Sequence, residues 1–172
     1  AEESSLLRSL PGINRKMTLN LGVALLALTA GGQAGAVPTQ SVWQGTVSDA
    51  WTDGDNWASG IAPSLSGTFV FVTPGASDRS PVIDGEVGEA NLLFVGSQDQ
   101  ADLTIKNGGQ LNANNVTVGN STNNSALPGI GDESGSIHVT GTASGLSADF
   151  LTIGYYGDGT LDVADGATVT IG

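Results

Sequence analysis

The sequence predicts an all-β chain that winds as a solenoid. Three observations predict it. Short segments rich in Val, Ile and Leu recur through the second half, Gly follows most of them, and no segment of useful length beyond residue 36 has helical periodicity. Gly accounts for 26 of the 172 residues, well above its average share of roughly 7%.

The first 36 residues have the features of a signal peptide. Basic residues precede an apolar run over residues 19–28, and small residues ending in Ala34-Gly35-Ala36 follow it. A basic segment, a short apolar run and an A-x-A-like end are the parts of a secretory leader, and the run is short for a membrane span. We therefore expect a helical signal peptide over 1–36 and a mature chain that begins at Val37.

The rest of the chain is acidic and has no cysteine. Beyond residue 36 the cations are Arg79 and Lys106, against fifteen carboxylates, the chain's seventeen less Glu2 and Glu3. So few cations cannot neutralise a phosphate backbone, and nucleic acid is excluded as a partner. Without cysteine there are no disulfides and no thiolate metal sites, so packing must stabilise the fold.

Two kinds of short strand alternate from residue 91 onward. The first kind ends in a β-branched residue followed by Gly, and the second lies between members of the first. The first kind comprises 93–96, 116–119, 151–154 and 169–172, and the second comprises 103–105, 137–139 and 161–163. Because alternate strand residues point to opposite faces, the outer two residues of each apolar, polar, apolar triplet should face inward. We expect one inward stack of Val95, Val118, Ile153 and Ile171, and another of Ile105, Val139 and Val163.

This alternation is what a solenoid needs, with one strand of each kind in every coil. Each strand would pair in parallel with its equivalent about 4.8 Å away. The coils differ in length, and the longest interval, 120–136, has the Asn-, Ser- and Gly-rich composition of a surface loop. Within it, Asn123 and Asn124 are candidate binding residues.

The chain divides into three regions on this interpretation. They are the signal peptide over 1–36, a Trp-containing N-terminal cap with the first strands over 37–90, and the repeats over 91–172. The repeats stop without a capping sequence, so we expect a fragment of a longer array.

The region before the repeats carries an ordered series of motifs. They are Trp43-Gln44-Gly45, Trp51, Asn56-Trp57, Gly60-Ile61-Ala62-Pro63 and the strand 68–72. This order resembles the start of autotransporter passenger domains of Gram-negative bacteria, which use type V secretion. The segment 153–169 is similar to one of their Gly-rich repeats, and the matching stretches cover most of residues 43–172.

The resemblance implies a right-handed parallel β-helix with variable loops. It also implies export through the periplasm to the cell surface or outer membrane, by way of an outer-membrane β-barrel translocator at the far end of the same polypeptide. The implied role is a structural scaffold or an adhesin for a host or biofilm surface, with carbohydrate among the possible ligands. Two alternatives stay open: a carbohydrate-active β-helix enzyme whose active residues lie outside this sequence, and an extracellular matrix protein without the barrel.

The candidate binding residues in the cap are Trp43, Trp51 and Trp57. Exposed indoles suit sugar faces, whereas clustered Trp residues near the start of a solenoid more often bury apolar area and close its core, which is the interpretation we prefer. The segment 53–56 alternates oxygen-bearing residues but lacks the Gly and Glu of a calcium loop. His138, the sole histidine, stands at an outward strand position. We expect no catalytic residue, no metal site and no cofactor.

Overall fold

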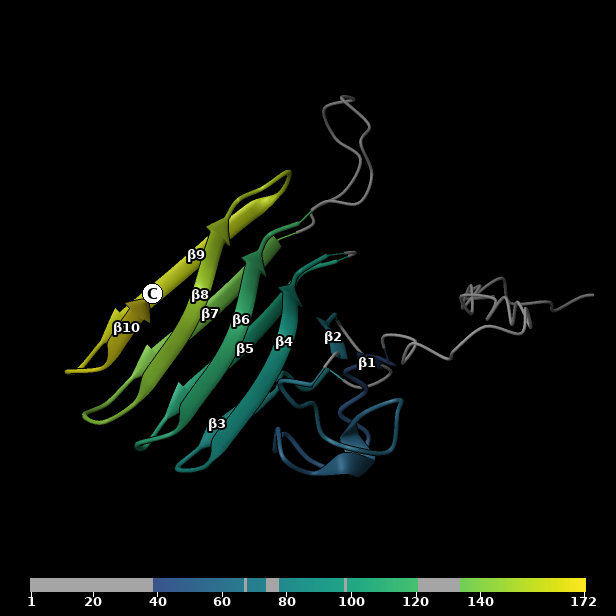
Figure 1. Cartoon of the computed structure of the whole chain (residues 1–172). Helices are drawn as coiled ribbons and strands as arrows, with labels where there is room; N and C mark the ends of the chain where they lie inside the picture. Colours follow the sequence, from purple (N-terminus) through teal and green to yellow (C-terminus); the bar gives the residue numbers. More distant parts are fainter. Residues whose placement is uncertain (1–38, 67, 74–77, 98, 121–133) are drawn as a thin grey trace, which may run out of the picture. The chain divides into compact units, whose positions relative to one another are not determined.

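The chain forms two parallel β-sheets in the computed structural model, which describes residues 39–66, 68–73, 78–97, 99–120 and 134–172 (Figure 1). The predicted signal peptide over 1–36 lies outside the described residues. The larger sheet has the order β1 (Thr39–Val42), β2 (Thr68–Val72), β4 (Val87–Val95), β6 (Gln110–Val118), β8 (Gly145–Ile153) and β10 (Thr168–Ile171). The smaller sheet has the order β3 (Val82–Asp84), β5 (Ala101–Lys106), β7 (Ser134–Thr140) and β9 (Asp158–Ala164). The only helical element among the described residues is a 3-10 turn, η1 (Gly54–Asn56), so the all-β prediction is confirmed for this part of the chain.

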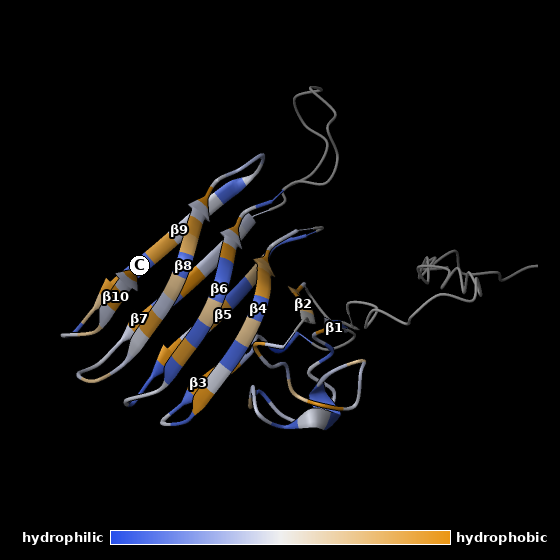
Figure 2. Ribbon diagram, viewed as in Figure 1, coloured by the Kyte–Doolittle hydropathy of each residue, from blue (hydrophilic) through white to orange (hydrophobic). Residues whose placement is uncertain are grey.

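From β3 onward, consecutive strands alternate between the two sheets. Each strand therefore pairs in parallel with the strand two places further along the chain. Parallel strands buried on one face need a continuous apolar surface there. Figure 2 shows apolar and polar residues following one another along these strands.

Register partners form columns of inward side chains that run across each sheet. In the smaller sheet one column is Ile83, Ile105, Val139 and Val163, which confirms the predicted stack of the last three. In the larger sheet the corresponding column is Val72, Val95, Val118 and Ile153. The first three members of each column are at most 1% exposed, whereas Val163 and Ile153 are 43% and 45% exposed.

The predicted place of Ile171 in that column is wrong. Ile171 pairs with Ala148 and lies in the column of Ala90 and Ala113. The reason is that β8, like β4 and β6, is nine residues long, and β10 pairs with the first half of β8, not the second. The sequence motif in β10 fits either half because both halves alternate apolar and polar residues.

The nine-residue strands change direction at a polar corner. In β4 and β6 the register runs from Ala90 with Ala113 directly to Leu92 with Asn115, which leaves Asn91 and Asn114 outside the ladder. The Asn114 side-chain amide donates a hydrogen bond of 2.7 Å to the Asn91 side-chain oxygen. The alternation of buried and half-buried residues shifts phase at this point, so the two halves of each strand face the core on either side of the corner.

The Gly that follows each of these strands is required by the backbone. Gly96, Gly119 and Gly154 have φ values of +72°, +69° and +72°, a conformation that favours Gly. A Cβ at Gly96 would meet the Ser134 carbonyl oxygen at 2.2 Å, and one at Gly119 would meet the Asp158 carbonyl oxygen at 2.3 Å. The positive φ and these close backbone contacts explain why Gly recurs at the end of each of these strands.

The predicted loop over 120–136 is shorter than expected. Ser134, Gly135 and Ser136 form the start of β7, and Gly135 pairs with Ala101 of β5. A Cβ at Gly135 would meet the Val95 carbonyl oxygen at 2.1 Å, so this Gly belongs to the packed strand. The predicted loop therefore cannot include residues 134–136, and residues 121–133, with Asn123 and Asn124, lie outside the described residues. Within the described residues, no helix is both long and apolar enough to cross a bilayer.

Candidate functional site

The three tryptophans form a buried cluster. Trp43, Trp51 and Trp57 are 1%, 0% and 2% exposed. Trp57 makes edge-to-face contacts with both others, at centroid distances of 5.0 Å to Trp43 and 4.8 Å to Trp51. The indole N–H of Trp57 donates to the Trp51 carbonyl at 2.7 Å. The rings are covered by protein and offer no face to a sugar, so the stacking-platform interpretation is wrong for this structure and the rings are part of the hydrophobic core.

Asn56 fixes the loop that carries this cluster. Its side-chain oxygen accepts hydrogen bonds from the backbone N–H groups of Val47 at 3.0 Å and Ser48 at 2.9 Å. Its amide donates to the Ser48 hydroxyl at 2.8 Å and to the Ala50 carbonyl at 3.0 Å. The residue is fully buried, so these four bonds replace all the water that it would otherwise bind.

The acidic turn before Trp57 is held by protein hydrogen bonds. Asp53 caps η1 by accepting from the Asp55 backbone N–H at 3.1 Å, and its second carboxylate oxygen accepts from the Ser48 hydroxyl at 3.2 Å. In the part of the chain that the structure describes, no three His, Asp or Glu side chains gather where they could hold a metal ion.

Arg79 lies beside the tryptophan cluster, far from it in sequence. One guanidinium nitrogen, Nη1, donates to the carbonyl oxygens of Gly45 at 3.1 Å and Thr46 at 3.2 Å, and the Arg79 carbonyl accepts from the Trp43 indole N–H at 2.7 Å. Two open clefts flank Arg79 and Ser80, with volumes of about 210 and 380 Å³.

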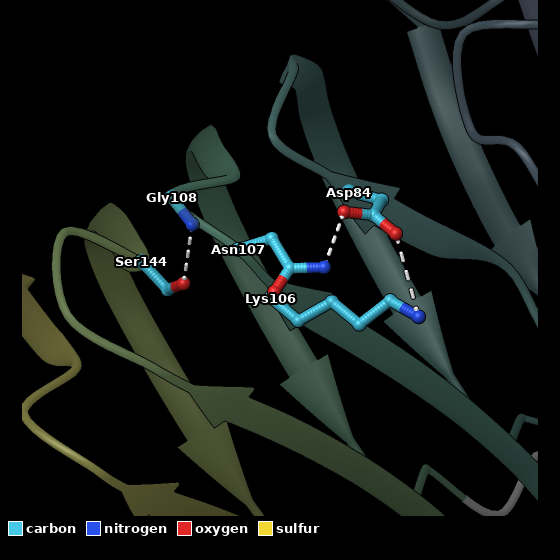
Figure 3. A network of polar contacts seen from close by, with 5 residues as sticks. All are labelled: Asp84, Lys106, Asn107, Gly108 and Ser144. Atoms are coloured by element: carbon cyan, nitrogen blue, oxygen red, sulfur yellow. Dashed lines mark hydrogen bonds and ion pairs between the residues drawn. The ribbon is translucent and has the colours of Figure 1, made fainter.

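A second set of polar contacts lies where strands β3 and β5 of the smaller sheet end and their turns begin (Figure 3). Asp84 accepts a hydrogen bond of 2.7 Å from the Asn107 amide and lies 3.4 Å from the Lys106 ammonium. The Asn107 hydrogen bond, together with the charge of Lys106, lowers the pKa of Asp84 below its usual value. The backbone N–H of Gly108 donates to the buried Ser144 hydroxyl at 3.0 Å, which links this turn to the next.

His138 occupies the outward strand position that the sequence predicts. Its ring nitrogen Nδ1 lies 3.7 Å from a carboxylate oxygen of Asp162, its register partner on β9, and both side chains are substantially exposed. An exposed pair of this kind has the geometry of a cross-strand surface contact.

Comparison with known proteins gives one partial likeness. No family model matches the chain, and no solved structure matches it. Over 101 residues, or 55% of its length, the chain is 33% identical to the uncharacterized protein YuaQ of Escherichia coli strain K12. The match spans 7% of that protein, so the chain covers only a small part of its relative's length.

Sequence reasoning missed the roles of two residues. From the sequence, Arg79 is treated only as one of two cations, yet Arg79 joins the loop at Gly45 and Thr46 to the segment that precedes β3. From the sequence, Asn56 is named only within a motif and an acidic segment, whereas the structure shows it fully buried. Its place next to Trp57 is the one signal in the sequence that points to a buried polar residue.

Proposed function

We propose that this chain is part of an exported cell-surface protein of the autotransporter passenger type, in which a right-handed parallel β-helix acts as a scaffold or adhesin. One observation carries the proposal. The connections that follow strands of the smaller sheet, 85–86, 107–109, 141–144 and 165–167, have two to four residues. Those that follow β4, β6 and β8 have between four and fifteen residues.

A contrast of this kind suits a display scaffold. Every strand repeats one apolar pattern, which leaves little room for specificity, whereas loops of variable length and composition at one edge can carry binding residues. The motif order from Trp43 to the strand 68–72, and the signal peptide predicted over 1–36, support export. The 15-residue connection 119–133, which includes Asn123 and Asn124, is the proposed contact with a host or biofilm surface.

The proposal predicts that this connection can be exchanged without loss of the fold. Residues 119–133 would be replaced by the five-residue sequence of 96–100, which joins the equivalent strands β4 and β5. In the full-length natural protein, produced in its own bacterium, we expect unchanged accessibility to protease added outside the cell, together with a severalfold loss of surface attachment.

The matched control replaces the short connection 154–157 by the same sequence. We expect it to leave attachment within twofold of the unaltered protein. Full protease resistance of the unaltered protein in intact cells would contradict surface location. Undiminished attachment of the exchanged protein would contradict the role of this loop.

A further inference from the structure

One turn of the smaller sheet carries the only Asn-Gly pair of the sequence. Asn107 and Gly108 follow β5, Asn107 is exposed, and the two residues have φ values of +54° and +84°. An Asn side-chain amide reacts most readily with the next backbone nitrogen when Gly follows, because Gly has no side chain to hinder the approach. The turn therefore contains a reactive pair, and its geometry decides whether the pair reacts.

The reaction needs no reactant other than water. The Gly108 backbone nitrogen attacks the Asn107 side-chain carbon Cγ and gives up its proton, and the side-chain nitrogen Nδ2 leaves as ammonia. The new bond closes a five-membered succinimide ring, which water opens at either of its two carbonyl carbons. The product is an aspartate or an isoaspartate at position 107, with a carboxylate in place of the amide.

In the folded chain, hydrogen bonds hold the two reacting groups on opposite sides of the turn (Figure 3). The Gly108 N–H donates at 3.0 Å to the hydroxyl of the buried Ser144, in the connection that follows β7. The Asn107 side-chain amide donates at 2.7 Å to Asp84, at the end of β3. Since β5 lies between β3 and β7 in the smaller sheet, one neighbour holds the attacking nitrogen and the other holds the side chain that it must reach.

We propose that Asn107 is a site of spontaneous deamidation that the folded sheet protects and that becomes reactive when this turn opens. The inference goes beyond the adhesive function and does not rest on it.

The product of the reaction fits the turn poorly. A carboxylate at position 107 would face the Asp84 carboxylate where the amide now donates, so like charges would meet. An isoaspartate also adds a carbon to the backbone near Gly109, where even a Cβ would meet the Ile83 carbonyl oxygen at 2.4 Å. A chain that has reacted should therefore not re-form this turn, and the modification marks chains in which the turn has been open.

The experiment follows deamidation at position 107 by peptide mass spectrometry while the purified chain is incubated at neutral pH. A synthetic peptide with the sequence of residues 104–110 gives the rate without the fold. We expect the folded chain to react at least about tenfold more slowly than the peptide, the effect of two hydrogen bonds. Equal rates in the chain and the peptide would overturn the proposal.

Two variants each remove one of the protecting hydrogen bonds. Ser144→Ala removes the acceptor of the attacking backbone N–H, and Asp84→Ala removes the acceptor of the side-chain amide. We expect each to raise the rate at least about threefold, the effect of losing one hydrogen bond, while the β signal in circular dichroism stays unchanged. If Ser144→Ala loses that signal because its site is buried, the exposed position Asp84 decides the outcome alone.

Thr140→Ala is the matched control. It removes a hydrogen bond of 2.9 Å to Asp165, which joins the end of β7 to the turn after β9 and does not involve the reacting pair. We expect it to leave the deamidation rate unchanged. Folded variants that react no faster than the unaltered chain, or an equal increase with Thr140→Ala, would overturn the proposal.

Discussion

At the scale of single residues, Asn56 does more for stability than its place in a short turn suggests. Replacing the buried Asn56 by Ala removes the acceptor of the part-buried backbone N–H groups of Val47 and Ser48 and the donor to the Ala50 carbonyl. We expect the free energy of unfolding to fall by about 2–4 kcal/mol, measured by urea denaturation followed through tryptophan fluorescence. Asp55→Ala, at an exposed neighbouring position, is the control. Equal effects of the two changes would show that the four hydrogen bonds of Asn56 contribute little.

Asp84 makes stability depend on pH in a known direction. Its hydrogen bond from Asn107 and its contact with Lys106 lower its pKa in the folded state, so the folded protein holds this proton less tightly than the unfolded chain. The stabilisation is therefore present above the unfolded value of about 3.9 and is lost as pH falls through the lower folded value.

The test compares urea midpoints of the unaltered chain and Asp84→Asn. We expect the unaltered chain to be the more stable at about pH 7 and the difference to shrink below about pH 3.9. A difference that stays constant across this range would mean that Asp84 stabilises the turn through shape and not through its charge.

At the scale of strands, β6 offers a direct test of which face is inward. Val118 is fully buried between Val95 and Ile153, whereas its neighbour Thr117 lies on the other face, next to Phe94. Val118→Asp places an unpaired charge in the core and should lower the free energy of unfolding by at least about 3 kcal/mol. Thr117→Asp should change it by less than about 1 kcal/mol. Similar losses for both, in circular dichroism melting curves, would contradict the assigned faces.

Strand type was predictable from the sequence, but strand length and register were not. Apolar triplets followed by Gly predict the ends of β4, β6 and β8, because a positive φ at that position favours Gly in the sequence. Their first halves, such as 87–90, contain Gly88 and Ala90, small residues that carry a weak apolar signal although both are buried. Because this signal is weak, the sequence predicts that Ile171 stacks on Ile153 in the second half of β8, whereas the structure pairs it with Ala148 in the first half.

The candidate site depends on contacts that the sequence does not encode locally. Trp43, Arg79 and Gln100 stand far apart along the chain and meet because the end of β2 and the start of β5 lie near the tryptophan cluster. Their juxtaposition follows from the parallel register, which a single sequence cannot fix. The burial of Trp51 and Trp57 was the exception, since clustering of large apolar rings already favoured a core role.

At the scale of the whole described fold, two columns of β-branched side chains and one polar corner repeat along the sheets. The repeating unit is a strand pair, which here means two consecutive strands, one from each sheet. Each pair packs mainly on the pair before it and the pair after it, since pairing connects strands two places apart. Local damage should therefore spread along the stack through neighbours and weaken with distance. The acidic residues among those that the structure describes lie at outward positions and in turns, so water and salt screen their mutual repulsion.

The parallel register has a genetic consequence. Each strand pair forms the same parallel hydrogen-bonding pattern with the preceding pair as with the following one. An in-frame duplication of residues 87–109, which encode β4 and β5 with their connections, would thus insert a pair whose two edges both find matching neighbours. Genes for such chains can lengthen or shorten by whole strand pairs through unequal recombination, and selection can adjust the length of the two sheets while leaving the tryptophan cluster untouched.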